Sequence, residues 1–557
     1  RPPNTLEHIA GVVPLAITVE GHAALCLVGQ DRGTMWLEQT LSSSRRRVLI
    51  ILTLLAVTLT YSIFSVGRLS ELAGSAAQRE PADGSLNPSK ASPPSIRPPR
   101  NALPGTSRAS TAKVDTNLDL TSVCANPRPN TDSWGDVLVE GSSNVLESAG
   151  KCCAACAAYK PTAEQDMLGC NVWVYCEDAG LCGKDHKACW LKHLAHPTAV
   201  EPSKKGPNVG WTSGFITRPR QTRAAQVPAD DDRRYHTVIT AQGSAVHWQS
   251  RVGYYWFLKT KRDCQAAGKC DMGGFTRLLH SGKEDDLMAE IPTWVAQPLP
   301  PEHPDHGYVV LNRPYALLQW IKGAVIPEKY VLMSEPDHVW LKPMPNLMTG
   351  TTPAAFPFFY IEPSKKEFLP IVQKFVGPIS RVEAEEIAPI GNAPTFMSVA
   401  DMKNVMPIWF NISIAVHNDE AASKAWGWVQ EMYAFTLSCY KAGIRDISLF
   451  LKMTSQPPWD SSMDPYYILH YTYGMDYTKE GVFTPGKIGE WRFDKRAYSL
   501  RPPPRNLGEP PEGMKNDLVR HLIHAINEAS SIIPDWDDYS ATGVAKQFWD
   551  GKTFATA

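Results

Sequence analysis

Short apolar runs recur through the second half of the chain. They occur at 235–242, 274–281, 330–339, 354–361 and 410–417. Each lies within the usual length range of a strand and is shorter than an average helix. The pattern therefore predicts five strands at these positions.

Longer segments between the runs carry apolar residues at spacings of three and four. In 247–261, for example, Trp248 and Val252 share one helical face. Similar segments follow at 313–322 and 421–443. Alternating strands and helices predict an α/β domain, with helices on both faces of a mainly parallel sheet. Ligands of such sheets bind beyond the carboxyl ends of the strands.

A different apolar run lies near the N-terminus. Val48–Phe64 reads VLIILTLLAVTLTYSIF, carries no charge and follows Arg45–Arg47. Its length is near the lower limit of about 17 to 25 residues for a membrane span. The positive-inside rule then predicts a cytoplasmic tail at 1–47, a signal anchor at 48–67 and a luminal remainder. The alternative is a cleaved signal peptide, for which the run is long.

Composition divides the rest of the chain. Residues 1–34 precede Met35 and are expected to be upstream sequence or a gene-model artefact. Residues 68–120 are rich in Ser, Pro, Ala and Arg and predict a disordered stem. We expect a linker at 221–234 and a tail at 541–557. A tail, one span, a stem and a luminal domain are typical of type II Golgi enzymes and also of many receptors.

Charge excludes one class of partner. The 557 residues carry a net charge of -1. A general polyanion binder would show a basic excess, so no nucleic-acid partner is expected.

Eight of the 12 cysteines lie in one short window. They are Cys124, Cys152, Cys153, Cys156, Cys170, Cys176, Cys182 and Cys189. Such density predicts a small domain held by disulfides in an oxidising compartment, with the pairing left open. A zinc cluster is the alternative, since Cys153 and Cys156 have CxxC spacing, but a matching second pair is missing.

The sequences CCAACAAYKPTAEQDMLGCNVWVYC, ACWLK and VGWTSGF lie within 121–220. Together they resemble the PAN/Apple family. The resemblance implies a small disulfide-rich α+β domain that binds a glycan or a protein and is not catalytic.

The segment Tyr330–Trp340 reads YVLMSEPDHVW and runs from an apolar strand into acidic residues. Glu335 and Asp337 are two residues apart, so in extended chain they point to the same side and repel each other unless a cation lies between them. A later histidine, His470, would complete a site for Mn²⁺ or Mg²⁺. His338 either ligates the metal or braces Asp337. The alternative is a pair of ordinary loop acids.

Further motifs follow in a fixed order: MGGFTRLLHSG, YVLMSEPDHV, PIGNAP, QPPWD, LHYTYG and GKIGEWRFDKRAY. Over 235–536 the chain thereby resembles the plant-type hydroxyproline O-arabinosyltransferases. The resemblance implies a GT-A-like domain, assigned to 235–540. It also implies retaining transfer of L-arabinofuranose from a UDP donor to 4-hydroxyproline of secreted proteins. The module at 121–220 is not part of the short plant enzymes.

The resemblance and the residue chemistry together give candidate contacts for the nucleotide sugar. They are His236, Thr237, Thr240, Arg277, Ser281, Glu335, Lys487 and Arg492. The residues of the first strand would hold the nucleotide or simply be buried there. An arginine fork suits a pyrophosphate, although Arg277 could instead form a structural salt bridge. Lys487 or Arg492 would stabilise the departing diphosphate.

Asp337 and Asp460 are the candidate catalytic carboxylates. Asp460 follows two prolines and is either a reaction-face acid or a turn residue. Asn392 and Glu431 are further site candidates, and Glu431 could instead satisfy buried polar groups.

Two other functions remain open. One is a peptidyl glycosyltransferase with another donor or acceptor, such as galactose onto serine. The other is a non-catalytic membrane protein that binds glycans or proteins through its cysteine-rich module. The intact Glu335, Asp337 and His470 argue against the second.

Overall fold

The structure is a computed structural model. It describes residues 13–19, 22–28, 123–124, 126–216, 232–241, 243 and 246–555. The chain divides into two compact units, 1–111 and 112–557. In the first unit, β1 (Val13–Val19) and β2 (His22–Val28) pair antiparallel.

The predicted signal anchor at 48–67 and the predicted stem at 68–120 lie entirely outside the described residues. Within the described part of the chain, no helix is both long and apolar enough to cross a membrane.

The cysteine-rich region forms a four-stranded antiparallel sheet in the order β4-β6-β5-β8. These strands are β4 (Asp136–Val139), β5 (Val172–Cys176), β6 (Cys189–His193) and β8 (Trp211–Phe215). Helix α3 (Ala149–Ala158) packs on this sheet. Ser148 caps its N-terminus, because its hydroxyl accepts a hydrogen bond from the Lys151 N–H. The remaining elements are β3 (Thr131–Asp132), β7 (Lys204–Lys205) and α4 (Ala179–Cys182).

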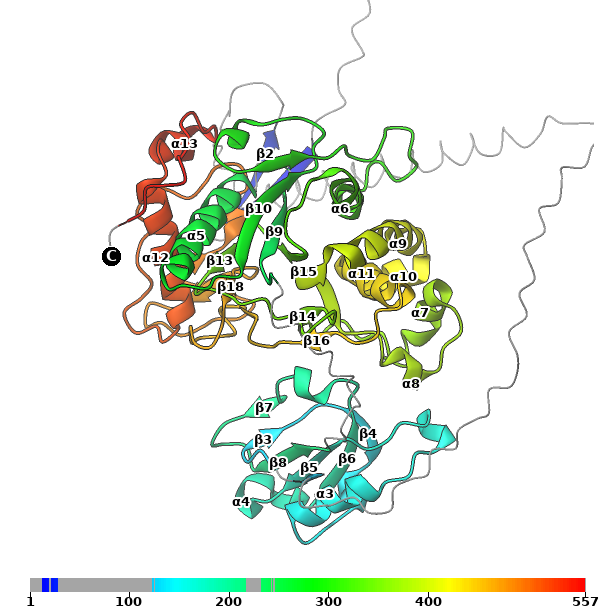
Figure 1. The fold of residues 1–557 in the computed structure, drawn as a ribbon. Helices are drawn as coiled ribbons and strands as arrows, with labels where there is room; N and C mark the ends of the chain where they lie inside the picture. Colours follow the sequence, from blue (N-terminus) through cyan, green and yellow to red (C-terminus); the bar gives the residue numbers. More distant parts are fainter. Residues whose placement is uncertain are drawn as a thin grey trace, which may run out of the picture. The chain divides into compact units, whose positions relative to one another are not determined.

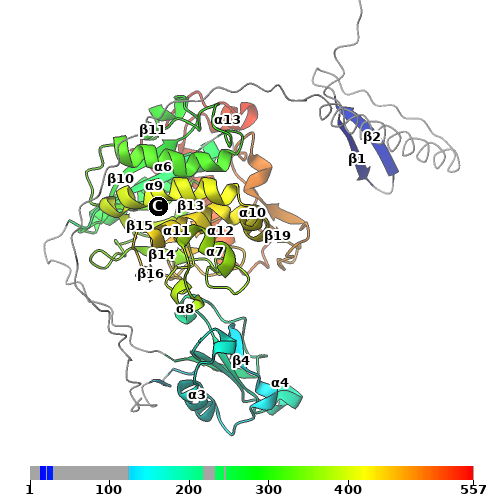
Figure 2. The ribbon, with the colours of Figure 1, turned by 90° about the vertical axis from the view of Figure 1, so that its right-hand side faces the viewer.

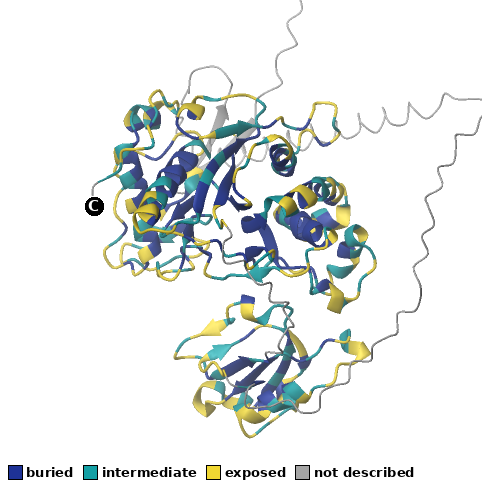
Figure 3. Ribbon diagram, in the orientation of Figure 1, coloured by how far each residue is buried: buried dark blue, intermediate teal, exposed yellow. Residues whose placement is uncertain are grey.

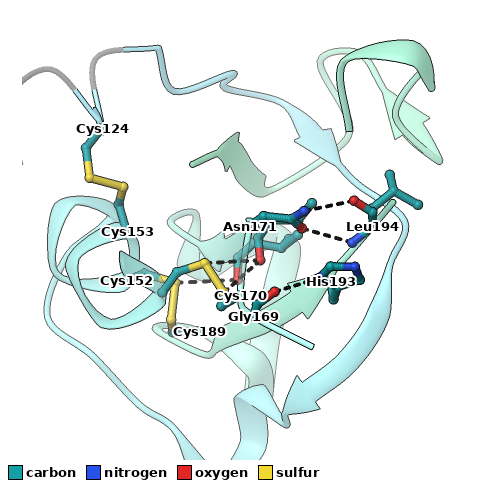
Figure 4. The surroundings of a disulfide bond; sticks show 12 residues. Cys124, Cys152, Cys153, Gly169, Cys170, Asn171, Cys189, His193 and Leu194 are labelled. Carbon is teal, nitrogen blue, oxygen red and sulfur yellow. Dashed lines mark hydrogen bonds between the residues drawn. A yellow bond between two sulfur atoms is a disulfide. The ribbon is translucent and has the colours of Figure 1, made fainter. Parts of the chain in front are cut away.

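All eight clustered cysteines form disulfides, as the sequence predicts. The pairs are Cys124–Cys153, Cys152–Cys189, Cys156–Cys170 and Cys176–Cys182. Figure 4 shows Cys124–Cys153 and Cys152–Cys189, both anchored on α3. A fifth disulfide, Cys264–Cys270, lies outside the module. The PAN/Apple identity of the module stays a prediction.

A seven-stranded sheet forms the centre of the large domain, in the order β11-β10-β9-β12-β15-β14-β16 (Figure 1). Its strands are β9 (Tyr235–Ala241), β10 (Met272–Leu279), β11 (Thr293–Val295), β12 (Tyr330–Ser334), β14 (Ala354–Pro357), β15 (Ile390–Ser398) and β16 (Ser448–Leu449). Only β15 runs antiparallel to its neighbours among these strands. The prediction of a mainly parallel sheet is therefore confirmed.

Helices cover both faces of the sheet, as predicted. Leu332 lies in the core beneath one face, while its neighbours Val331 and Met333 lie in the core of the other. Figure 1 shows α5 and α12 on one side, and α9 and α11 on the other. In the turned view of Figure 2, α6, α9 and α11 lie side by side. Figure 3 shows the central strands and the inner sides of these helices buried.

The helices of this domain have the following bounds. They are α5 (His247–Ala266), α6 (Asn312–Gly323), α7 (Leu369–Val376), α8 (Arg381–Ala384), α9 (Val399–His417), α10 (Glu420–Trp426), α11 (Gln430–Lys441), α12 (Asp517–Ile532) and α13 (Trp536–Thr542).

The strand predicted at 410–417 is wrong, because this segment is the second half of α9. The buried positions follow a helical spacing: Met402, Val405, Met406, Trp409, Ile412, Ser413 and Val416. The helix predicted at 421–443 is interrupted at Gly427, where a positive φ of 49° separates α10 from α11.

The order of the strands creates a crevice between β9 and β12. From β9 the sheet grows outward through β10 and β11, and β12 then returns to the other side of β9. The register pairs Ser334 with Ile239, so Glu335 follows beside Thr240. Such a reversal is where open α/β sheets bind their ligands.

The C-terminal part completes the domain with short strands. β13 (His338–Trp340), β18 (Ile468–His470) and β17 (Thr454–Ser455) form a second sheet in that order. A hairpin of β19 (Met475–Tyr477) and β20 (Trp491–Phe493) follows.

The segment assigned to a tail, 541–557, contributes to the core instead. Trp549 is buried, and its backbone N–H donates to Glu290 over 3.0 Å. The large domain therefore continues past residue 540.

Candidate active site

The turn after β12 carries the acidic pair. Glu335, Pro336 and Asp337 connect the end of β12 at Ser334 to β13. His338 Nδ1 lies 2.7 Å from Ser334 Oγ and 3.3 Å from the Glu335 backbone nitrogen. These contacts hold the His338 ring and fix Asp337 at the carboxyl end of a central strand.

Asp337 and His470 meet because β13 and β18 pair antiparallel, with His338 opposite His470. His470 Nε2 lies 3.2 Å from Asp337 Oδ2, and the two imidazole rings are 4.6 Å apart. The ammonium group of Lys495 forms an ion pair with the same carboxylate. Asp337 is 5% exposed and His470 is 12% exposed. The structure thus brings together Asp337 and the late histidine.

Burial and the neighbouring side chains set the charges of Asp337 and His338. Burial raises the pKa of the Asp337 carboxyl, but Lys495 and His470 outweigh it and hold that pKa well below its usual value. Burial lowers the pKa of His338 well below its usual value. Asp337 is therefore an anion and His338 a neutral imidazole at pH 7.

Three side chains form the one group in the described part of the chain that could hold a metal ion. The ligand atoms of Asp337, His338 and His470 lie within 4.8 Å of one another. His338 Nε2 and His470 Nδ1 are buried without a hydrogen-bond partner among the described residues. One carboxylate oxygen and two imidazole nitrogens suit Mn²⁺ and related divalent ions. His338, rather than Glu335, is the third member of this group.

Glu335 lines a cavity of about 410 Å³ at the crevice between β9 and β12. Arg313, from the first turn of α6, lies between two carboxylates there. Its Nη1 is 3.1 Å from Glu335 Oε1 and 3.5 Å from Glu431 Oε2. His280 and Thr240 also line the cavity, at the ends of β10 and β9.

The charges around the cavity are strongly coupled. Burial raises the pKa of Glu431 to about 7, because Arg313 offsets only part of this effect and Glu335 adds to it. Burial lowers the pKa of His280 to about 3, and Arg313 adds to that effect. Burial opposes the charge of Arg313, but Glu335 and Glu431 raise its pKa above the usual value.

The candidates on the first strand divide by position. Thr240 lines the cavity, whereas Thr237 is fully buried and is not among the lining residues. His236 lies near the amino end of β9, away from the carboxyl end where ligands bind. Its ring contacts Glu328 at 3.0 Å and Thr276 at 2.8 Å. Of the three, the structure places only Thr240 at the cavity.

Arg277 and Ser281 do not line the cavity. The Arg277 guanidinium is buried and donates to Thr293 Oγ1 at 3.0 Å and to Asp285 Oδ2 at 2.8 Å. Arg277 therefore forms the structural salt bridge that the sequence analysis gave as the alternative to a pyrophosphate contact. The Ser281 hydroxyl donates to the Lys283 carbonyl at 3.0 Å.

Lys487 and Arg492 belong to the β19–β20 hairpin. Lys487 is exposed in the loop, and Arg492 Nη2 lies 3.1 Å from Asp494. Neither is in the Asp337 cluster or the cavity lining. The cation that does contact Asp337 is Lys495, a few residues further along the same GKIGEWRFDKRAY motif.

Asp460 acts as a turn residue. Its Oδ2 accepts from the Gln456 N–H at 2.8 Å, and its Oδ1 accepts from the Tyr466 hydroxyl at 2.7 Å. It belongs neither to the Asp337 cluster nor to the cavity lining. Asn392 is buried within β15 and does not line the cavity, but Glu431 does.

Sequence reasoning missed Arg313, His280 and Lys495. Arg313 begins a helix, His280 follows a strand, and Lys495 begins a short 3-10 helix. The position of His280 after an apolar run at a carboxyl end was a usable signal. Single cations in polar motifs give no such signal, because many of them are solvated.

Solved structures of low similarity include a galactosyltransferase LgtC with donor and acceptor sugar analogues. It has 12% identity and a TM-score of 0.27, and the match covers 43% of this chain and 87% of that one. The bifunctional glycosyltransferase WbbM has 10% identity and a TM-score of 0.26, with 47% of this chain and 50% of that chain covered.

Sequence relatives are much closer. Hydroxyproline O-arabinosyltransferase 1 of Arabidopsis thaliana is 50% identical over 309 residues, covering 55% of this chain and 81% of the relative. Hydroxyproline O-arabinosyltransferase RDN1 of Medicago truncatula is 47% identical over 339 residues, covering 60% and 88%. Hydroxyproline O-arabinosyltransferase PLENTY of Lotus japonicus is 46% identical over 310 residues, covering 56% of this chain and 83% of the relative.

Two family models match the chain as well. The N-terminal domain model of the hydroxyproline O-arabinosyltransferase family matches 235–449, and the C-terminal domain model matches 467–537. Together they span more than half of the 557 residues, and they include Asp337, His470 and every polar residue lining the cavity. The chain therefore belongs to the hydroxyproline O-arabinosyltransferase family and is a glycosyltransferase.

Proposed function

We propose that this protein transfers L-arabinofuranose from UDP-L-arabinofuranose to the hydroxyl of 4-hydroxyproline in secreted or cell-wall proteins. The observation that carries the proposal is the match to relatives of that name at 45 to 50% identity. Retention at the anomeric carbon and a GT-A-like fold belong to the same proposal, through the family resemblance.

The proposed enzyme depends on Mn²⁺ or Mg²⁺, held by Asp337, His338 and His470. Two observations support this: the ligand atoms of the three side chains converge, and one nitrogen of each imidazole is buried without a partner among the described residues. A bound divalent cation would offset the negative charge of a departing diphosphate. Lys495, already in contact with Asp337, offers a second positive group to that diphosphate.

The proposed location is the Golgi membrane, with one N-terminal span and a luminal catalytic domain. The uncharged run at 48–64 after three arginines supports the span. The five disulfides support an oxidising compartment. The cysteine-rich module would bind a glycan or a protein there.

The test gives the purified full-length protein a hydroxyproline-rich peptide, Mn²⁺ and either UDP-arabinofuranose or UDP-galactose. Mass spectrometry then identifies the product. A pentose on hydroxyproline that disappears with EDTA is the expected result. A hexose product would replace the proposed donor, and no product with either donor would contradict the proposed function.

A further inference from the structure

The cavity between β9 and β12 contains three buried polar atoms without a hydrogen-bond partner in the described part of the chain. They are Thr240 Oγ1, His280 Nδ1 and Glu431 Oε1, each from a different element. Buried polar atoms are nearly always paired in folded proteins, so three in one cavity indicate a ligand that pairs them. The cavity volume of about 410 Å³ lies in the range of small-molecule sites.

The charge of the cavity argues against a diphosphate. Two carboxylates, Glu335 and Glu431, face one guanidinium, Arg313, and His280 is neutral. This arrangement has no excess positive charge to offer a phosphate group. Carboxylates are instead good acceptors for hydroxyl groups.

The remaining walls are apolar. Val246, Val309, Val310 and Pro336 line the cavity beside the polar groups. Polar groups interleaved with apolar surface fit a sugar, which presents hydroxyls and C–H groups around one ring. A hydroxyproline side chain offers a single hydroxyl, fewer than the polar atoms that need partners here.

The cavity also adjoins the Asp337 cluster. Glu335 and Pro336 line it and lead directly into Asp337 along the chain. A nucleotide sugar whose diphosphate lies at that cluster would extend its sugar into the cavity.

We propose that this cavity binds the sugar ring of the donor, with Thr240, His280 and Glu431 bonded to its hydroxyl groups. The inference rests on the proposed function for the presence of a nucleotide sugar. It adds the residues that hold the sugar and makes them the determinants of donor choice.

The test measures the affinities of UDP-arabinofuranose and of UDP alone by calorimetry, with Mn²⁺ and without acceptor. Glu431→Gln and Thr240→Val should weaken binding of the nucleotide sugar by about 10- to 100-fold, since each loses a buried hydrogen bond to the ligand. Binding of UDP should change less than about twofold, because the proposal places only the sugar ring in the cavity.

Thr237→Val is the matched control. Thr237 is on the same strand, is also buried and has a hydroxyl without a partner among the described residues, but it does not line the cavity. It should leave both affinities unchanged. Melting temperatures of all variants report whether each one folds.

Two outcomes would overturn the inference. Equal losses for UDP and the nucleotide sugar would place the nucleotide in the cavity. Unchanged donor affinity with a raised KM for the hydroxyproline peptide would place the acceptor there. If the wild type uses only UDP-galactose, the proposed donor fails, and the same comparison with that sugar still tests the cavity.

Discussion

At the scale of single residues, the Asp337 carboxylate has two close neighbours, a histidine and a lysine. The His470 imidazole and the Lys495 ammonium both contact its carboxylate. A carboxylate so placed is ionised at neutral pH, since these neighbours lower its pKa. It is therefore ready to bind a cation without first losing a proton.

The proposed metal site makes a prediction for His470. Replacing it by glutamine removes one ligand, so Mn²⁺ affinity should fall at least about tenfold. Calorimetric titration of the protein with Mn²⁺ measures the loss. His524→Gln is the control, because His524 is 54% exposed and its ring nitrogen lies 3.0 Å from Glu509, outside the proposed metal site. Equal Mn²⁺ affinity in the wild type and His470→Gln would contradict the ligand role.

Glu431 predicts a pH dependence of stability. Its pKa is raised from 4.5 to about 7 in the folded protein, so folding favours its protonated form. The resulting stabilisation is present below pH 4.5 and is lost as pH rises through 7, by at most about 3 kcal/mol. Urea unfolding of the wild type and Glu431→Gln at pH 5 and pH 8 measures it.

The variant has no titrating group at this position, so its stability should fall less between the two pH values than that of the wild type. Other titrating groups are common to both proteins and cancel in the comparison. Parallel pH profiles would show that Glu431 titrates normally in the folded state.

Part of this site could be predicted from the sequence, because polar residues at the ends of neighbouring strands lie close together in the fold. Asp337 and His470 each follow an apolar run, and pairing of those runs brings them together. Arg277 lies inside the apolar strand β10, where Asp285 and Thr293 occupy its guanidinium. Whether a buried arginine binds a ligand or a neighbouring acid depends on contacts distant in sequence, so its role could not be predicted.

At the scale of elements, α5 approaches the active-site turn closely. A Cβ atom on Gly253 would lie 3.0 Å from the Pro336 carbonyl oxygen and 3.2 Å from that of His338. Both atoms belong to the backbone that positions Asp337. The glycine therefore allows the helix to pack directly beneath the turn.

Gly253→Ala should displace this turn by a few tenths of an ångström and lower kcat about tenfold, because catalytic geometry is sensitive to small shifts. Steady-state kinetics and a thermal melt check that activity falls while the fold remains. Gly150→Ala on α3 is the control, since its nearest contact would be at 3.9 Å. Full activity of Gly253→Ala would mean that the turn tolerates the shift.

The prediction of helices and strands succeeded where the apolar residues follow one spacing, either that of a strand or that of a helix. The strands at 235–241 and 330–334 and the helix at 247–266 appear where the apolar pattern places them. The segment at 410–417 failed because isoleucine and phenylalanine favour strands, while its burial follows the longer helix that begins at Val399. Local propensity yields to packing at such positions.

At the scale of the whole molecule, disulfides are concentrated in one part. Four stabilise the cysteine-rich module, and the one in the large domain, Cys264–Cys270, closes only a short loop. The large domain has its own extensive cores on both faces of the sheet. Reduction should therefore affect the two parts very differently.

Mild reduction should unfold the cysteine-rich module and leave the large domain folded and active. Each native disulfide of a small domain contributes about 2 to 5 kcal/mol, and the module holds four. Calorimetry with and without reductant should show the loss of one unfolding transition, and an activity assay should show little change. A double Cys264→Ser, Cys270→Ser variant separates the effect of the fifth disulfide. Loss of both transitions would contradict this division.

The α/β architecture was predictable because strand-like apolar runs alternate along the chain with segments of helical spacing, and each element must bury one face. The boundary at 540 was not, since the segment around Trp549 has little periodicity and is held by contacts to Glu290. Irregular segments carry no periodic signal of their own packing.

If the proposed function is right, the site around Asp337 forms the bond between arabinose and hydroxyproline. The most direct measurement compares wild type and Asp337→Asn with UDP-arabinofuranose, Mn²⁺ and a hydroxyproline-rich peptide, using mass spectrometry to quantify the product. Asp464→Asn, at a carboxylate that is 88% exposed, is the control. We expect a pentose adduct from wild type and control, and at least about 100-fold less from Asp337→Asn. An equal yield from Asp337→Asn would contradict it.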